Sequence, residues 1–233
     1  MIMVVLITSL APVLIIIFYI YFRDKYDREP VGLLLRAVLL GVVIVLPVIL
    51  TESFLVRIMP PLGEGGEAFY HAFLVAGTSE ELFKFLALYL LIWKSPSFNE
   101  KFDGIVYAVF ISLGFAAVEN VMYVMDGGSQ TALVRALTAV PAHALFGITM
   151  GYYFGVAHMY SELRREYFLK SLLIPILLHG VYDFLLMIQR EWLLVAFVFY
   201  VVYLYLNGFK KMRILSDSSI YKPLEKNNKQ VLR

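Results

Sequence analysis

Seven long apolar runs divide this sequence and limit what it can fold into. They fall at about 2–22, 31–56, 68–93, 103–125, 131–158, 168–188 and 192–207, with polar or Gly/Pro-containing breaks between them. A helix needs roughly 20 apolar residues to cross the hydrocarbon core of a bilayer, and only the last run is clearly shorter. A soluble core of 233 residues does not need 61% hydrophobic side chains. We therefore predict an all-α, polytopic membrane bundle of about seven transmembrane helices.

Basic residues in the predicted loops set the expected orientation. Alternate loops and the C-terminal segment carry 15 of them, whereas the opposite loops carry only Arg57 and Arg190. Because Lys and Arg are concentrated in cytoplasmic loops, the N-terminus should lie outside and the C-terminus in the cytoplasm. The basic set is Arg23, Lys25, Arg28, Lys94, Lys101, Arg164, Arg165, Lys170, Lys210, Lys211, Arg213, Lys222, Lys226, Lys229 and Arg233.

One domain accounts for most of the chain. We expect residues 1–215 to form a single integral-membrane domain and residues 216–233 to be a short polar cytoplasmic tail without fixed structure. The first run lacks the basic segment and small-residue cleavage site of a signal peptide, so it is predicted to be a retained span.

Ionisable side chains occur where these spans should be apolar. The run 68–93 contains Glu80, Glu81 and Lys84, and the i,i+4 and i,i+3 spacings let the lysine pair with either glutamate. A charge near the bilayer centre costs at least roughly 2.5–3.5 kcal/mol, so such residues are usually paired, inward-facing and functional. Three later runs place further polar or aromatic candidates at similar depths: Phe115, Glu119, Asn120, His143, His179 and Asp183.

Structural roles are the alternative for single residues in this set. A lone membrane histidine more often bonds a neighbouring helix than a ligand, and Asp183 could merely orient His179. Arg36 and Arg135 lie close enough to predicted helix ends to extend to the interface. Three buried glutamates are not needed for helix association, however, because hydroxyls and amides serve at lower desolvation cost. The set as a whole therefore predicts a functional site.

The residue types favour activation of water. Two adjacent carboxylates cannot both ionise easily at low dielectric, so Lys84 would hold one ionised while the other carries a proton. Such a pair suits general acid–base catalysis, with two imidazoles bonding the water or an oxyanion. Alternatively, Glu80, Glu119, His143 and His179 could bind zinc, although no HExxH motif is present. With no cysteine and no GxSxG motif, a thiol nucleophile and a serine elbow are excluded.

The motifs resemble those of a known family. Glu80-Glu81-x-x-Lys84, Phe115-x-x-x-Glu119, His143 and His179-x-x-x-Asp183 are similar, in order, to the motif set of the PrsW family, bacterial intramembrane proteases related to the CAAX prenyl endopeptidases. Similarity extends over about residues 10–210 and includes segments 23–30, 102–108, 112–116, 134–137 and 178–184. The predicted domain 1–215 would then be a protease domain.

The resemblance implies a substrate and roles. Proteins of this family, in the bacterial cell membrane, make the first, extracytoplasmic-side cut in a single-span anti-sigma factor during envelope stress, so no nucleic-acid partner is expected. Glu80 would be the base, Glu81 would assist, and His179 would bond the water or oxyanion. The position of Glu119 is a histidine in the CAAX enzymes and that of Asp183 an asparagine, which leaves zinc an open possibility. His143 belongs to the family's own pattern.

Three rival functions use the same residues. A proton-coupled transporter or proton relay would arrange them along a path across the bilayer, but they cluster at one depth and no inverted repeat is visible. A seven-helix receptor with a lysine-linked chromophore would have a lysine in its last span, and none occurs in 192–207. In a non-catalytic membrane scaffold the glutamates would be replaceable.

Overall fold

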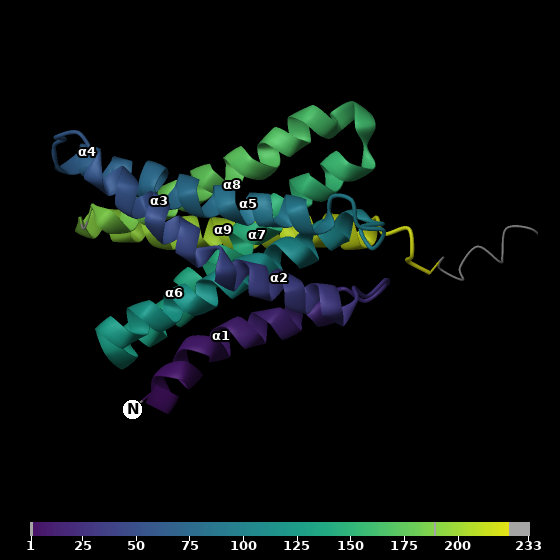
Figure 1. Ribbon diagram of the computed structural model, residues 1–233, viewed down its shortest axis with the longest axis horizontal. Coiled ribbons are helices and arrows are strands. Elements are labelled where there is room, and N and C mark those ends of the chain that lie inside the picture. The colour runs from purple at the N-terminus through teal and green to yellow at the C-terminus, as the bar shows by residue number, and fades with distance from the viewer. Residues whose placement is uncertain (1, 189, 224–233) are drawn as a thin grey trace, which may run out of the picture.

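Helices make up nearly all of the computed structural model, which describes residues 2–188 and 190–223 (Figure 1). No strand occurs among these residues, so the predicted all-α class is confirmed. The elements are α1 (Ile2–Arg23), α2 (Val31–Val43), α3 (Val45–Arg57), α4 (Glu64–Phe69), the π-helix η1 (Tyr70–Thr78), α5 (Ser79–Ile92), α6 (Lys101–Leu137), α7 (Ala139–Met159), the short 3₁₀ turn η2 (Ser161–Leu163), α8 (Arg164–Met187) and α9 (Glu191–Asp217).

Six helical segments in the described part of the chain are long and apolar enough to cross a membrane. They are Val5–Arg23, Val31–Arg57, Lys101–Gly128, Gln130–Met159, Ser161–Met187 and Glu191–Asp217. The remaining predicted run, 68–93, corresponds to α4, η1 and α5, which follow one another without a break from 64 to 92. None of those three elements reaches spanning length alone, because the π-helix divides the segment.

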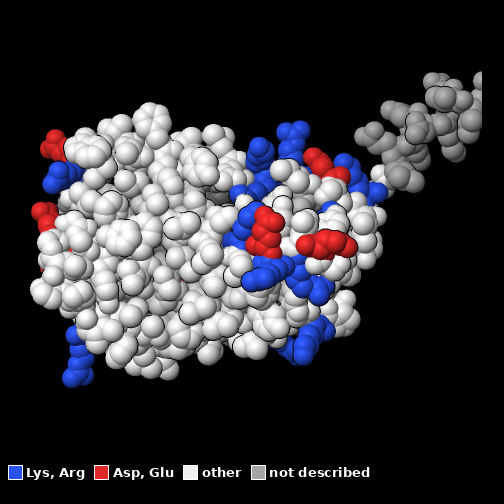
Figure 2. Space-filling view, turned by 90° about the horizontal axis from the view of Figure 1, so that it is seen from above, with Lys and Arg blue, Asp and Glu red and all other residues white. Residues whose placement is uncertain are grey.

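The ends of the bundle differ in charge. The start of α1 and the end of α9 lie at opposite ends of the molecule (Figure 1). On the face drawn in Figure 2, Lys and Arg gather at the end where α9 finishes, and a broad band without charged side chains lies beside them. An uncharged band between charged ends is the pattern expected for a protein that spans a bilayer.

The predicted break at 126–130 is a kink within α6. Gly128 departs from helical angles there, with φ 72°, and two helical parts of α6 meet at this residue. Glycine reaches positive φ without a steric penalty, so it allows the chain to change direction. Two predicted boundaries differ from the structure. α9 extends beyond 207 to Asp217. Of the predicted tail 216–233, residues 224–233 lie outside the described part of the chain, and Ser219 donates a hydrogen bond to Glu100 (2.5 Å).

Glycines bring the two most buried spans, α6 and α7, into close contact. Gly147, Gly151 and Gly155 recur every four residues on α7 and therefore share one face of the helix. A Cβ built on Gly151 would lie 2.2 Å from the carbonyl oxygen of Gly104 on α6, and one on Gly155 would lie 2.2 Å from that of Lys101. Small residues at such spacing let membrane helices approach until their backbones touch.

Replacing Gly151 should therefore loosen the bundle. We expect Gly151→Ala to lower the thermal unfolding midpoint in detergent, because its methyl group must displace backbone atoms of α6, at about 1–3 kcal/mol for overpacking. Gly32→Ala is the matched control, since nothing lies within 4 Å of a Cβ at that position on α2. If the unfolding midpoint fell equally in the two variants, the close contact between Gly151 and α6 would not contribute to stability.

Buried acids connect the first loop to the start of α6. The Asp103 carboxylate accepts hydrogen bonds from the backbone N–H groups of Glu100 (2.8 Å) and Asn99 (2.9 Å) and so caps the helix. The Tyr107 hydroxyl, one turn further on, donates to Glu29. Burial raises the pKa of Glu29 from 4.5 to about 7, and burial likewise raises that of Asp24 to about 7. The similar segments 23–30 and 102–108 thus meet in one polar cluster.

This cluster predicts a stability that falls with pH. A carboxyl whose pKa is higher in the folded protein than in the unfolded chain stabilises the fold below the unfolded value, and that contribution is lost as pH rises through the folded value. For Glu29 the loss falls between about pH 4.5 and pH 7. We expect the unfolding midpoint of the wild type to drop across this range and Glu29→Gln to flatten the drop. Glu162→Gln, at an exposed position, is the control; an unchanged slope in Glu29→Gln would contradict the assignment.

Candidate active site

A π-helix leads directly into the predicted glutamate pair. η1 ends at Thr78, and Glu80 and Glu81 lie in the first turn of α5. The Thr78 hydroxyl donates to the carbonyl of Phe73 (2.7 Å), five residues back, as the wider π winding requires. A Cβ on Gly180 of α8 would lie 2.3 Å from the Phe73 ring, so this glycine is what allows η1 and α8 to pack closely. π-helical segments are rare and frequently occur at functional sites.

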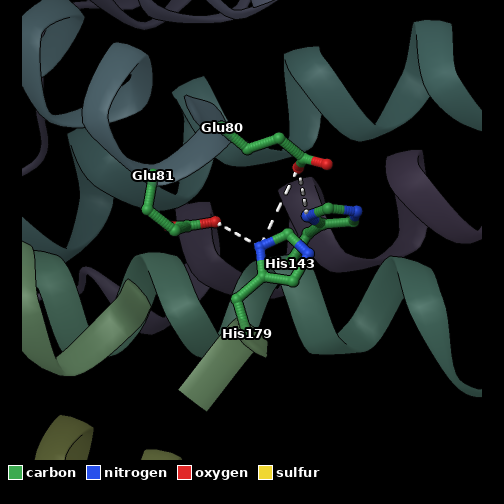
Figure 3. Close-up of side chains that lie close together, drawn as sticks. All are labelled: Glu80, Glu81, His143 and His179. Carbon is green, nitrogen blue, oxygen red and sulfur yellow. Dashed lines mark hydrogen bonds and ion pairs between the residues drawn. The ribbon is translucent and has the colours of Figure 1, made fainter. Parts of the chain in front are cut away.

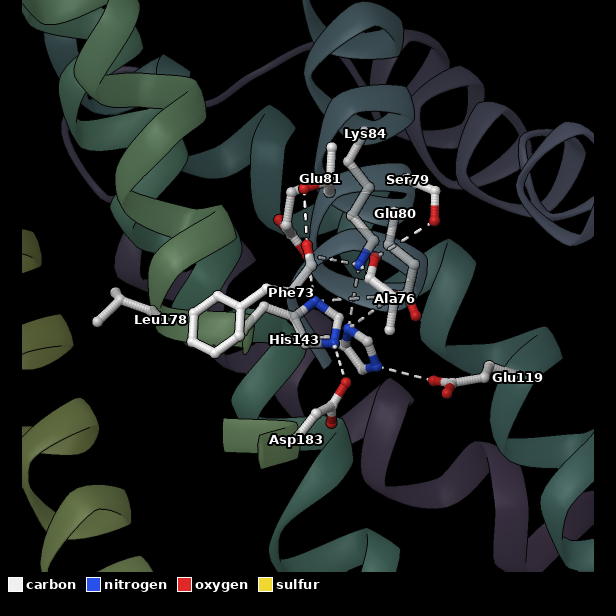
Figure 4. Close-up of polar contacts among 12 residues, drawn as sticks. Phe73, Ala76, Ser79, Glu80, Glu81, Lys84, Glu119, His143, Leu178 and Asp183 are labelled. Carbon is white, nitrogen blue, oxygen red and sulfur yellow. Dashed lines mark hydrogen bonds and ion pairs between the residues drawn. The ribbon is translucent and has the colours of Figure 1, made fainter. Parts of the chain in front are cut away.

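The Lys84 ammonium is the centre of the cluster. Its Nζ lies 2.9 Å from Glu80 Oε2, 2.8 Å from Glu81 Oε1 and 3.1 Å from His143 Nδ1 (Figure 4). Below it, the ring centroid of Phe115 lies 4.3 Å away, a cation–π distance. Lys84 is 1% exposed and Glu81 0%, so every charge here must be compensated from within the protein. The two side chains predicted to support the pair, Lys84 and Phe115, both contact the cluster.

His143 connects this centre to α6. Because an ammonium can only donate, His143 Nδ1 accepts from Lys84, and the Nε2–H then donates to Glu119 Oε2 (2.7 Å). Glu119 also pairs with the Arg135 guanidinium (2.9 Å), whose Nε donates to Asn120 (2.9 Å). The expectation that Arg135 extends to the membrane interface is therefore wrong. The chain changes direction at the Gly128 kink and so brings Arg135 back to Glu119, whereas Arg36 is exposed as expected.

His179 closes the cluster from α8. Its Nδ1 lies 3.0 Å from Glu81 Oε1 and 3.9 Å from Glu80 Oε2 (Figure 3). Its Nε2 lies 3.3 Å from Asp183. The Phe146 ring stacks on the imidazole with centroids 4.9 Å apart. Asp183 therefore orients His179, as its i+4 spacing suggests. Of the predicted residues only Asn120 is remote from the centre, since it joins Arg135 to the Ser9 carbonyl of α1 (2.8 Å).

A cavity of about 670 Å³ opens onto one side of this cluster. Glu80, His143 and His179 line it, and Glu81 and Lys84 lie behind its wall. Four ionisable residues that the sequence-based prediction of the site did not include also line it: Glu52, His71, Asp126 and Arg135. A search for every ionisable residue within the apolar runs would have found all of these except Asp126, which follows the run 103–125.

Four of these side chains could hold a metal ion. One ligand atom each from Glu80, Glu81, His143 and His179 lies within 4.8 Å of the others, and all four residues are buried. Carboxylate and imidazole ligands suit hydrolytic zinc, and Glu81 Oε2 is buried with no hydrogen-bond partner among the described residues. The ligand types thus fit a divalent cation, which would replace the hydrogen bond that Lys84 donates to His143 Nδ1. The predicted ligand set had Glu119 in place of Glu81; in the structure Glu119 contacts the opposite nitrogen of His143.

Comparison with known proteins identifies the family. The model of the family described as "PrsW family intramembrane metalloprotease" matches residues 29–207. The chain belongs to the PrsW family. Protease PrsW of Bacillus subtilis (strain 168) is 38% identical over 206 residues, which cover 88% of this chain and 92% of the relative. That of Clostridioides difficile (strain 630) is 40% identical over 211 residues, 88% of each chain. No solved structure matches.

Membership confirms two predictions. The chain is an intramembrane protease, as the motif resemblance implied, and it is a multi-pass membrane protein of a family described as metalloproteases. This favours peptide hydrolysis over the transporter, receptor and scaffold alternatives.

Arg135 should couple to Glu119 in this PrsW-family site. Arg135→Gln leaves the Glu119 carboxylate without its guanidinium partner, and the pair is only partly buried, so we expect a loss of stability of about 1–3 kcal/mol and reduced cleavage. The double variant Arg135→Gln/Glu119→Gln removes both charges and should regain part of that stability, which thermal unfolding of all four members of the cycle would measure. Strictly additive losses would show that the two side chains do not interact.

Proposed function

We propose that this PrsW-family protease hydrolyses a peptide bond of a single-span membrane protein with water activated by Glu80. The observation that carries this proposal is the difference between the two adjacent glutamates. The cavity is lined by Glu80 but not by Glu81, which is fully enclosed and bonded to Lys84 and His179. A general base must reach the proton that it abstracts, and Glu80 is the member of the pair that a water in the cavity could contact.

The remaining residues would have distinct roles. Glu80 takes a proton from the water and returns one to the leaving amine, while Lys84 balances the negative charge of the pair. His143 and His179 line the cavity, and each would exchange one of its present hydrogen bonds to bond the water or the oxyanion. Glu119 and Asp183 orient these two imidazoles. When bound by Glu80, Glu81, His143 and His179, a divalent cation such as zinc would polarise the water or the substrate carbonyl. No covalent intermediate is expected.

The topology follows from the charges and the ends of the bundle. We assign seven spans, the seventh being the continuous segment of α4, η1 and α5, with the N-terminus outside and the C-terminus in the cytoplasm of a bacterial cell. Ends of the described chain that lie on opposite sides of the bundle require an odd number of crossings. The basic end in Figure 2 would be cytoplasmic. Residues 1–215 would then form one protease domain.

The proposed substrate is a single-span anti-sigma factor, cut near the outer side of its span in envelope-stress signalling. Relatives named Protease PrsW support the activity, and the resemblance described above supports the substrate. A substrate helix would have to unwind before its peptide carbonyl could reach the water, because a helix hydrogen-bonds its own backbone. It would enter near Glu119 and the bend at Gly128, on the proposed outer side.

Single substitutions test the catalytic roles. With purified protein and a single-span reporter, we expect Glu80→Gln to lower the cleavage rate at least about 10²-fold, the contribution typical of a general base. Glu81→Gln and His179→Ala should also lower it, and Glu64→Gln, at an exposed position, should not. The mechanism is wrong if Glu80→Gln and Glu81→Gln both fold and keep full cleavage. Loss of activity with a chelator and recovery with zinc would establish the metal.

A further inference from the structure

One carboxylate on the cavity wall, that of Glu52, has no hydrogen-bond or ion-pair partner among the residues that the structure describes. Glu52 lies on α3 within the span Val31–Arg57 and lines the same cavity as Glu80 and Glu119. No hydrogen bond or ion pair joins it to any residue that the structure describes. The adjacent hydroxyl groups do not bond to Glu52 either, because those of Thr51 and Ser53 donate to backbone carbonyls of α3 (2.8 and 2.7 Å).

The other acids of the cavity are all accounted for. Glu80 pairs with Lys84 (2.9 Å), Glu119 with Arg135 (2.9 Å) and Asp183 with His179 (3.3 Å). Asp126, at an exposed position, needs no counter-ion. Glu52 alone among the described lining residues is an unpaired acid in the membrane layer.

The electrostatic surroundings make Glu52 a site for positive charge. Five carboxyl groups line the cavity. Three of them pair with Lys84, Arg135 and His179, which leaves Glu52 and the exposed Asp126. A cationic side chain in the cavity would give Glu52 the charge partner that the described residues do not provide.

We infer that Glu52 binds a lysine or arginine side chain of the substrate beside the scissile bond. The inference rests on the proposed function and adds a substrate class to it: spans with a basic residue near their outer end. The position of Glu52 along its helix supports this substrate class. Glu52 lies five residues before the end of α3 at Arg57, which is about 8 Å along a helix axis. A basic side chain at that depth can still extend toward the interface before it binds, so a single-span substrate can carry one.

Kinetics with matched reporters provide the first test. Single-span reporters carry Lys, Gln or Glu at one position near the outer end of the span. A series of such reporters places this position at each residue in turn on either side of the cleavage site. At the matching position we expect wild type to show a KM about tenfold lower for Lys than for Gln, with similar kcat, and Glu52→Gln to abolish that preference. Asp126→Asn, which removes a carboxylate from an exposed part of the lining, should keep it. Equal preference in wild type and Glu52→Gln, or equal loss in Glu52→Gln and Asp126→Asn, overturns the inference.

Crosslinking tests the location without cleavage. Since the chain has no cysteine, Glu52→Cys in a Glu80→Gln background introduces a unique thiol. It should form a disulfide with a reporter cysteine at the preferred lysine position, more readily than with one two turns away. Leu50→Cys, which is exposed on α3, is the control and should not crosslink selectively. If wild type cleaves no reporter, the proposed function fails, and crosslinking alone decides the role of Glu52: selective disulfide formation supports it, and none overturns it.

Discussion

The contact of one ammonium with three acceptors determines the structure of this site. Lys84 bonds Glu80, Glu81 and His143, all buried. Removing such charges from water costs several kcal/mol for each ion, and only close, complete pairing recovers that cost. The pairing continues outward, from His143 to Glu119 and then to Arg135. Helices α5, α6 and α7 are therefore held at one level by electrostatics, and His179 adds α8 through Glu81.

Such pairing needs helices at fixed, short separations. The glycines at α6–α7 and at η1–α8 supply them, because their backbones touch where any side chain would clash. Packing and polar contacts thus depend on each other. The glycines let the helices approach closely, and the ion network then joins side chains of α5, α6, α7 and α8 across these contacts. Catalytic groups need this kind of rigid support to hold a productive arrangement.

The sequence predicted the composition of the site better than its connections. Span length and the spacing of Glu80, Glu81 and Lys84 were enough to predict a buried ion cluster, because helical periodicity fixes which side chains share a face. It could not predict that Arg135 turns inward, since that depends on how the chain changes direction at Gly128 and on how the two helical parts pack. Glu52 was overlooked because it is a lone acid in an otherwise apolar run, and its position on the cavity depends on tertiary packing. The π-helix has no sequence signal of its own.

Adjacency of two identical side chains on a helix explains why the pair can divide its work. Consecutive residues point about 100° apart around a helix axis, so Glu80 and Glu81 must face different surroundings. Glu80 reaches the cavity, and Glu81 faces α8 and bonds His179. Because Lys84 follows at four and three residues, it lies between them and contacts both. One carboxylate can then meet the substrate water while the other anchors the histidine. Two acids in different environments are the usual basis for separate roles in catalysis, and here the helix itself provides the difference.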